Sequence, residues 1–294
     1  MAASSLRREI KALRAAIEAA TPKELDIPDP VAWAESVSGF SLDEWQKGVL
    51  RSNAKRLMLL CSRQSGKSEI VSLLAATIAI RGGAVIVVAP SLRQSSNLFR
   101  RMRGHLQRAG ARFTRETTTE IALAGNGWAT CLPGDRPSML RGLSLRHTGE
   151  AALLIDECAY VKDELWPVAS PMAAAAPNAR IILLSTPCGP VGEFHRIWQS
   201  EDEPYERVTV TAADCPRISP AFLEEEKRRL GVLFEQEYMA RFIASGNSVF
   251  SADVLAAMFN DVSPEEQTGG MSGDWSQLLF AEDDPQPISK FRAF

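Results

Sequence analysis

One stretch near residue 60 constrains the fold of this chain more than any other. An apolar run, a polar loop and a helical segment follow each other directly: RLMLLC (56–61), SRQSGKS (62–68) and EIVSLLAATIAI (69–80). The first has the length of a buried strand, and the last has the length of a helix that ends before a glycine pair. A glycine-containing loop in this position presents backbone N–H groups and a helix N-terminus to an anion, so the order predicts a phosphate-binding loop.

The loop follows the P-loop (Walker A) pattern G-x-x-x-x-G-K-S/T at every position but the first, where Cys61 replaces glycine. In such a loop Lys67 would reach the β and γ phosphates of a nucleotide, and Ser68 would bind Mg²⁺. The other residues expected around the phosphates are Ser62, Arg63, Gln64, Ser65 and Gly66. The alternative, an ordinary turn between a strand and a helix, is disfavoured by the flanking pattern.

A second apolar run ends in two carboxylates. AALLID (151–156) delivers Asp156, and Glu157 follows it directly. Ligands of open α/β sheets lie at the carboxyl ends of the strands, so both side chains are expected at the nucleotide site. Asp156 would bind the magnesium ion and Glu157 would polarise the attacking water, as in a Walker B element. Alone, such an ending is often only the start of a polar loop; beside a P-loop it predicts an enzyme that hydrolyses ATP with Mg²⁺.

The remaining pattern gives the fold class. Further strands are predicted at AVIVVAP (84–90), ARIILLS (179–185) and ERVTVTA (206–212), and a hairpin at 117–133 around Asn126-Gly127. Helices are predicted for the arginine-rich segment after Pro90, for 219–230 and for 232–244. Strands that alternate with helices predict an α/β protein with a mostly parallel sheet flanked by helices, a P-loop NTPase fold with a small C-terminal helical segment.

Four parts are expected along the chain. Residues 1–30 would form an N-terminal helix and a proline-rich linker, and residues 31–215 the P-loop ATPase core. Residues 216–250 would form a helical linker subdomain. Residues 251–294, rich in glycine, proline and acidic residues, are expected to be a loosely ordered tail.

Charge and composition narrow the partners. The formal net charge of −3 argues against indiscriminate nucleic-acid binding, but one segment without acidic residues carries Arg93, Arg100, Arg101, Arg103, Arg108 and Arg112. This segment could follow a DNA backbone; a solvated face and a contact with a neighbouring subunit are equally open. The sequence contains no apolar run of about 18 residues, so it predicts no membrane-spanning helix. Five scattered cysteines without a CxxC pair indicate reduced thiols rather than zinc ligands or disulfides.

Together these motifs resemble the ATPase domain of phage and prophage terminase large subunits. The resemblance runs from about Asp43 to Phe250 and rests on Trp45-Gln46, SRQSGKS, APSLRQS (89–95), LRG (140–142), LLIDECAYV (153–161) and LLSTPCGPVGEFHRIW (183–198). It implies an ASCE/RecA-like ATPase that drives double-stranded DNA into a procapsid. It also implies a portal protein and a terminase small subunit as partners, a homo-oligomeric ring, expected from the family to have five subunits, and a place in the host bacterial cytoplasm, transiently at the portal.

The resemblance also assigns residues. Gln46 would hydrogen-bond the adenine edge, Arg63 would act as an arginine finger in cis, and Ser185-Thr186 would sense the γ phosphate and couple hydrolysis to motion. The alternatives are an exposed helix glutamine, a structural or DNA-facing arginine, and a strand-end cap. Arg141-Gly142 corresponds to an element before the Walker B strand and receives no role.

The nuclease domain of this family is not expected in this chain. The family normally continues into a ribonuclease-H-like nuclease, and the roughly fifty residues after Ser245 are too few for one, so we expect no nuclease here, whether through a split gene or a truncation. Two other functions are open. One is a helicase-like DNA translocase, whose expected QxxGR motif the sequence lacks. The other is a catalytically inactive prophage remnant or assembly protein. The intact catalytic candidates argue against it: Lys67, Ser68, Asp156 and Glu157.

Overall fold

The structure is a computed structural model that describes residues 27–141, 143, 145, 149–174, 176 and 178–244. The chain divides into two units, Met1–Ser245 and Gly246–Phe294, and every described residue belongs to the first. The predicted N-terminal helix and the predicted tail at 251–294 lie outside the described residues, as does Gly142.

The described residues form one eight-stranded sheet with the strand order β3-β4-β5-β2-β6-β7-β1-β8. Its strands are β1 (Arg56–Cys61), β2 (Ala84–Ala89), β3 (Phe113–Glu116), β4 (Glu120–Leu123), β5 (Trp128–Pro133), β6 (Ala151–Asp156), β7 (Ala179–Ser185) and β8 (Glu206–Val210). The strands from β5 to β8 in this order pair in parallel, and β3, β4 and β5 pair antiparallel. The predicted mostly parallel sheet and the hairpin are therefore confirmed. Strand β3 was not predicted, since three of its four residues are exposed and it has no apolar alternation.

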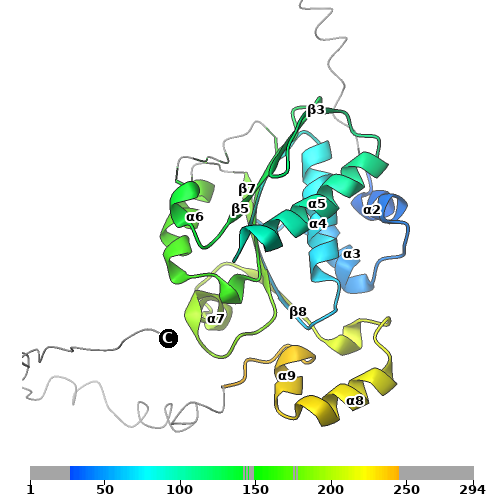
Figure 1. The fold of residues 1–294 in the computed structure, drawn as a ribbon, viewed down its shortest axis with the longest axis vertical. Helices are drawn as coiled ribbons and strands as arrows, with labels where there is room; N and C mark the ends of the chain where they lie inside the picture. Colours follow the sequence, from blue (N-terminus) through cyan, green and yellow to red (C-terminus); the bar gives the residue numbers. More distant parts are fainter. Residues whose placement is uncertain are drawn as a thin grey trace, which may run out of the picture. The chain divides into compact units, whose positions relative to one another are not determined.

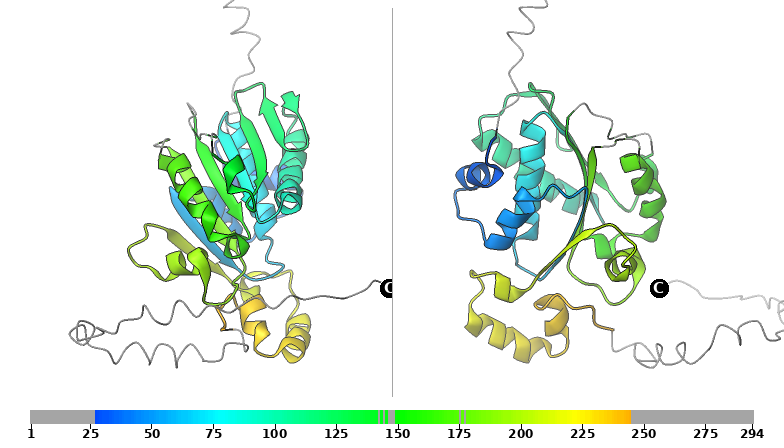
Figure 2. Two further views of the ribbon diagram at one scale, coloured as in Figure 1. Left: turned by 60° about the vertical axis from the view of Figure 1, so that its left-hand side comes forward. Right: turned by 180° about the vertical axis from the view of Figure 1, so that it is seen from behind.

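Helices cover both faces of the sheet (Figures 1 and 2). One face carries α2 (Pro30–Ser38), α3 (Glu44–Arg51), α4 (Lys67–Ile80) and α5 (Leu92–Arg108). The other face carries α6 (Trp166–Ala174) and α7 (Gly192–Gln199), while α8 (Pro220–Leu230) and α9 (Leu233–Glu237) lie beyond one end of the strands. Four 3₁₀ turns connect these elements: η1 (Pro137–Met139), η2 (Cys158–Tyr160), η3 (Asp163–Leu165) and η4 (Ala212–Asp214).

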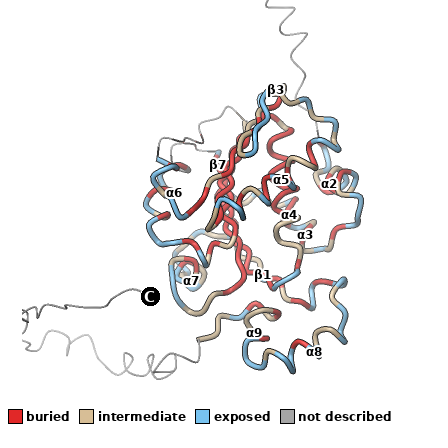
Figure 3. Tube along the Cα trace, viewed as in Figure 1, coloured by how far each residue is buried: buried red, intermediate tan, exposed pale blue. Residues whose placement is uncertain are grey.

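The central strands are buried on both sides (Figure 3). In β1, Leu57 and Leu59 belong to the apolar cluster under α4, whereas Met58 and Leu60 belong to the cluster on the opposite face. This alternation explains why the sequence of such a strand is a continuous apolar run: each residue faces one of two cores.

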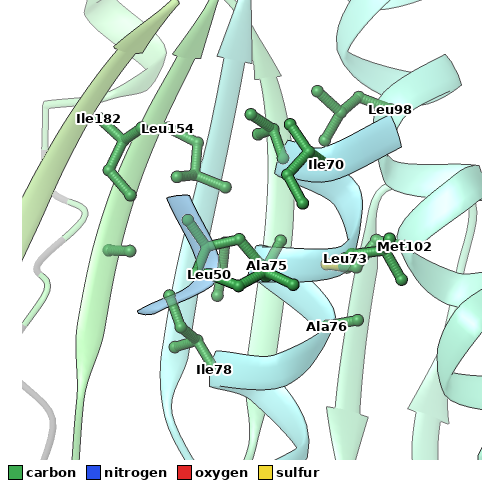
Figure 4. Packing of buried hydrophobic residues seen from close by; sticks show 14 of the residues in the cluster. Leu50, Ile70, Leu73, Ala75, Ala76, Ile78, Leu98, Met102, Leu154 and Ile182 are labelled. Carbon is green, nitrogen blue, oxygen red and sulfur yellow. The ribbon is translucent and has the colours of Figure 1, made fainter. Parts of the chain in front are cut away.

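Helix α4 packs against the sheet and against the neighbouring α5, where Ile70 and Leu73 lie beside Leu98 and Met102 (Figure 4). All residues from Ile70 to Ile80 are buried, so the helix that follows the P-loop is anchored along its whole length. In the neighbouring α5, the helix predicted for the arginine-rich segment, the apolar side chains of Leu98, Met102 and Leu106 are buried in the same cluster. Within the described residues no helix combines the length and apolarity needed to cross a membrane.

The two C-terminal helices differ in how well the sequence predicts them. Helix α8 begins after a Ser219 cap and ends before Gly231 as expected. The predicted helix at 232–244 is wrong in length, because α9 ends at Glu237 and Ala240 has a φ of 54°. The carbonyls of Glu237 and Tyr238 accept hydrogen bonds from Arg63 N and Ala212 N, at 2.7 and 2.8 Å, so tertiary contacts use carbonyls that a longer helix would need.

A close approach in the β4–β5 hairpin gives a test of the packing. A Cβ atom at Gly127 would lie 1.9 Å from the carbonyl oxygen of Ala79, at the end of α4. We therefore expect Gly127→Ala to lower the free energy of unfolding by about 1–3 kcal/mol or more, as overpacking does. Urea denaturation followed by circular dichroism measures this.

Gly48 provides the matched control, because it lies inside α3 with no atom within 4 Å of an added Cβ. Gly48→Ala should be neutral or stabilise by about 0.5–1 kcal/mol, since alanine favours the helix. Equal effects of the two substitutions would contradict the close packing of the hairpin on α4.

Candidate active site

The loop between β1 and α4 has the backbone of an anion cradle. Gln64 and Gly66 adopt positive φ values of 59° and 93°, which turn the chain back toward the start of α4. Strand β8 fixes the loop from outside, since Ser62 N donates to Val210 O at 2.7 Å, and within the loop the Ser65 hydroxyl donates to Ser62 O at 2.9 Å. Lys67 and Ser68 follow as the first two residues of α4, where the helix dipole favours negative charge.

The position of Cys61 explains why glycine is dispensable there. Cys61 is the last residue of β1, is paired with Val210 in β8, and is fully buried. The positive φ values fall three and five residues later, so residue 61 needs no left-handed conformation. Burial raises the pKa of its thiol to about 12, which keeps it neutral.

Gln46 lies against this loop. It is buried rather than exposed, and a Cβ at Gly66 would be 2.9 Å from Gln46 Nε2. Its Oε1 accepts a hydrogen bond of 3.0 Å from Asp43 N, as part of a capping box at the start of α3. The glutamine is therefore held with its amide nitrogen beside the P-loop.

The two carboxylates after β6 reach the same place from another strand. Strand β7 separates β6 from β1 in the sheet, and all three run in parallel. Lys67 Nζ lies 2.7 Å from Glu157 Oε1, with the two side chains only 12% and 24% exposed. The predicted meeting of the P-loop and the Asp-Glu pair is thus present in the structure.

Glu157 has an unusual backbone. Its φ and ψ of 50° and 46° are left-handed, a conformation that costs a non-glycine residue about 1–3 kcal/mol. Its N–H donates to Asp156 Oδ1 at 2.9 Å, and its buried Oε2 has no hydrogen-bond partner within the described part of the chain. The turn directs one carboxylate oxygen of Glu157 at Lys67 and leaves the other oxygen buried and unsatisfied.

Asp156 is almost completely buried. Burial first, and the neighbouring Glu157 second, raise the pKa of its carboxyl to about 6, although Lys67 and the Glu157 N–H act in the opposite direction. A carboxylate in this state gains from a cation, since a positive charge nearby favours its ionised form.

Arg63 points to the C-terminal helices rather than to Lys67. Its Nε lies 2.7 Å from Glu237 Oε2, its backbone N–H donates to Glu237 O, and its side chain is 67% exposed. Gln64 is also exposed at the tip of the loop.

The end of β7 lies between the two segments that carry Lys67 and Glu157. The buried Ser185 accepts a hydrogen bond of 3.2 Å from Ala159 N in the turn after Glu157. Thr186 is buried beside Tyr160, whose hydroxyl donates to Pro187 O at 3.5 Å. Burial is the main reason that the pKa of Tyr160 is raised, and its hydrogen bond with Thr186 opposes the shift. Ser185 therefore directly supports the turn that follows Asp156 and Glu157.

Arginines of the basic segment make contacts within the fold. Arg101 lies 2.9 Å from Glu69 Oε2, Arg103 lies 3.5 Å from Glu116 Oε1, and Arg108 contacts the buried His105 at 2.6 Å. The two pairs with glutamates reduce the charge that α5 can offer to a polyanion, and all three contacts favour a structural role for these side chains.

Three residues at the site were not predicted. Arg217 contacts Ser65 and Asp43, and Glu237 holds Arg63. The D-x-x-Q spacing of Asp43 and Gln46 is a capping-box signal that the sequence does contain. Arg217 and Glu237 have no local pattern that marks them.

This set of groups suits a polyphosphate with a divalent cation. The loop N–H groups and Lys67 supply positive potential, whereas Asp156 and the unsatisfied oxygen of Glu157 supply ligands for a cation or a water. Ser68 follows Lys67 in the first turn of α4.

Comparisons with known proteins agree with this arrangement. A family model described as "Terminase large subunit, T4likevirus-type, N-terminal" matches residues 58–257. A terminase large subunit of Thermus phage G20c is 26% identical over 256 residues, which cover 72% of this chain and 51% of the relative, and that of Thermus virus P23-45 has the same values. The chain thus spans about half the length of the curated relatives it matches.

Solved structures show the same fold. The large terminase ATPase domain of Thermus phage P74-26 superposes with a TM-score of 0.58 and 22% identity, covering 71% of this chain and 97% of that one. The large terminase of another thermophilic bacteriophage, in complex with ADP, gives a TM-score of 0.56 and 14% identity, covering 68% of this chain and 54% of that one.

The raised pKa of Asp156 predicts a pH dependence of stability. Between pH 3.8 and about 6 the folded protein retains a proton that the unfolded chain has released, so the free energy of unfolding falls as pH rises through this range. Asp156→Asn removes this contribution. From pH 5 to pH 7.5 the variant should therefore gain about 1–2 kcal/mol relative to the wild type, measured by urea denaturation without nucleotide.

Asp202→Asn, on an exposed turn, is the control and should show no such gain. A difference between Asp156→Asn and the wild type that stays constant with pH would contradict the burial of this carboxyl.

Proposed function

The chain belongs to the T4-like-virus-type family of terminase large subunits, matched over residues 58–257, and from this premise we propose that it hydrolyses ATP to drive double-stranded DNA into a procapsid. The observation that carries the proposal is the 2.7 Å contact between Lys67 and Glu157, which unites the P-loop with the carboxylates after β6. We assign residues 31–215 to the ATPase core and residues 216–250 to a linker subdomain.

The phosphates of ATP would bind the backbone N–H groups of residues 64–68, because the N–H groups of Ser62 and Arg63 already donate to Val210 O and Glu237 O. Gly66 supports this assignment, because its φ of 93° and the side chains against it leave no room for a Cβ. Bound Mg²⁺ would supply positive charge to the phosphate oxygens, with Ser68 and Asp156 as its protein ligands; Mg²⁺ commonly takes its remaining ligands from waters and substrate phosphates.

Lys67 and Glu157 would exchange partners when nucleotide binds. Lys67 is attracted more strongly to the phosphates than to one carboxylate, so Glu157 would be released from the ion pair. The freed carboxylate would then orient and polarise the attacking water. The left-handed backbone at Glu157 supports this role, because strained residues that are held by surrounding structure cluster at functional sites.

Arg63 would have to leave Glu237 to act as an arginine finger. Its backbone lies in the loop, and its exposed side chain is long enough to swing, so a triphosphate would compete with Glu237 for the guanidinium. Gln46 would read adenine, since its Nε2 hydrogens and the second lone pair of Oε1 complement the N7 and N6 positions of that base.

Ser185 and Thr186 would couple hydrolysis to motion. Ser185 holds the turn after Glu157, and Gly189 in the following loop donates to Gln236 Oε1 of α9 at 3.4 Å. The end of β7 thus connects the carboxylate turn to the linker helices, which supports a role in transmission.

The wider assembly follows the family. We propose double-stranded DNA, a portal protein and a terminase small subunit as partners of a homo-oligomeric ring, acting at the procapsid in the host cytoplasm.

An ATPase assay with and without DNA tests the proposed function. We expect Mg²⁺-dependent hydrolysis that double-stranded DNA stimulates several-fold, because a packaging motor couples turnover to its track. Stimulation by single-stranded DNA alone would favour a helicase-like translocase. Nucleotide binding without turnover under any condition would favour an inactive remnant or assembly protein.

Glu157→Gln tests the general base. The amide keeps the shape of the side chain but accepts no proton, so kcat should fall by about 10²–10⁴-fold while ATP binding persists. Glu164→Gln, in an exposed turn downstream, is the control and should hydrolyse ATP at the wild-type rate. Unchanged turnover in Glu157→Gln would remove Glu157 from this role.

A further inference from the structure

Arg217 lies where the P-loop meets the helix that carries Gln46. Its Nη2 donates to the carbonyl oxygen of Ser65 at 2.9 Å, and its Nη1 lies 2.6 Å from Asp43 Oδ2. The side chain of Arg217 is 48% exposed, whereas that of Asp43 is only 10% exposed, so a guanidinium at the surface pairs with a carboxylate that is mostly buried. One guanidinium therefore joins the first residue before α3 to the middle of the P-loop.

Asp43 connects this arginine to Gln46. Its carboxylate binds Arg217, and its backbone N–H donates to Gln46 Oε1 at 3.0 Å. At Gly66, an added Cβ would meet Gln46 Nε2 at 2.9 Å and Arg217 Nη2 at 3.2 Å. The amide of Gln46 and the guanidinium of Arg217 thus lie against the same glycine, and Asp43 is hydrogen-bonded to both side chains.

The contact with Ser65 also acts on the loop itself. A charged donor on a carbonyl oxygen polarises that peptide group, which strengthens the hydrogen bonds made by its N–H. The peptide that Arg217 polarises joins Ser65 to Gly66, and its N–H belongs to the loop that would surround the phosphates. Arg217 is therefore placed to influence both phosphate affinity and the orientation of Gln46.

We propose that Arg217 is a positioning residue that fixes Gln46 against the P-loop and so sets the preference for adenine over guanine. The inference rests on the proposed ATPase function. A fixed carboxamide complements the N7 acceptor and the N6 donor of adenine, whereas guanine presents the O6 acceptor in place of the amino group. If α3 loosens, the carboxamide can rotate and accept either base, so selectivity falls together with affinity.

Arginine suits this role better than lysine. Its planar guanidinium reaches two acceptors in different directions, whereas an ammonium on a flexible stem cannot hold the same fork. Arg217→Lys keeps the charge and removes this geometry. Asp43→Asn weakens the same bridge from the other side.

Calorimetric titration with ATPγS and with GTPγS, both with Mg²⁺, tests the proposal through binding alone. In Arg217→Lys we expect the Kd for ATPγS to rise about tenfold, as for the loss of one charge-assisted hydrogen bond, and the Kd for GTPγS to rise less. The selectivity ratio is the Kd for GTPγS divided by the Kd for ATPγS. Asp43→Asn should lower this ratio, as Arg217→Lys does.

Arg229→Lys is the matched control. Arg229 also forks onto a carboxylate, with 2.8 and 2.6 Å to Glu226, but both residues belong to α8. Its substitution should leave the selectivity ratio at the wild-type value. In a Gln46→Ala background, adding Arg217→Lys should change the ratio no further, because the reading group is already gone.

Other outcomes separate this inference from the proposed function. If Arg217→Lys lowers the melting temperature but retains the wild-type ratio of the two Kd values, Arg217 is only structural and the inference is wrong. If the wild type binds neither nucleotide, the ATPase proposal fails and this inference fails with it.

Discussion

The ion pair between Lys67 and Glu157 depends on the order of the strands. The two residues follow β1 and β6, which are not neighbours, because β7 lies between them. Leu184 of β7 pairs with both Leu59 of β1 and Asp156 of β6. The shared register therefore brings the ends of β1 and β6 to the same edge of the sheet. A contact of 2.7 Å across an intervening strand then requires long side chains and a turn that directs Glu157 inward. The ion pair therefore requires the strand order, the register and the left-handed turn together.

The polar groups around this ion pair are held in states that do not stabilise the fold. Glu157 combines a left-handed backbone with an unsatisfied buried oxygen, and burial raises the pKa of Asp156. The surroundings offset this destabilisation, since α4 is buried along its length and the central strands face two apolar cores. Sites that must bind a highly charged ligand are commonly less stable empty than their surroundings would allow, because their charges are arranged for the ligand.

Much of this could be predicted, and the exceptions share a cause. The central strands were predictable because each is a continuous apolar run, and the juxtaposition of Lys67 with Glu157 because the carboxyl ends of parallel strands meet at one edge. Strand β3 was missed because its side chains are mostly exposed and its pairing partner, not its composition, makes it a strand. Helix α9 was predicted too long because the carbonyls at its end bind the P-loop and η4. Arg217 meets Ser65 across 152 residues of sequence, a separation that no local spacing encodes.

These long-range contacts have a common target. The backbone of the P-loop is held by β8 at Ser62, by α9 at Arg63 and by Arg217 at Ser65, three segments that all follow β7 in the chain. Glycine-containing loops with positive φ values lose more conformational entropy on ordering than helices or strands, so such a loop needs support from outside to keep one shape. Here that support comes from the C-terminal part of the described chain. Because the end of α9 also contacts the loop after β7 through Gln236, a displacement of the P-loop backbone would alter contacts with β8, with Arg217 and with the end of α9.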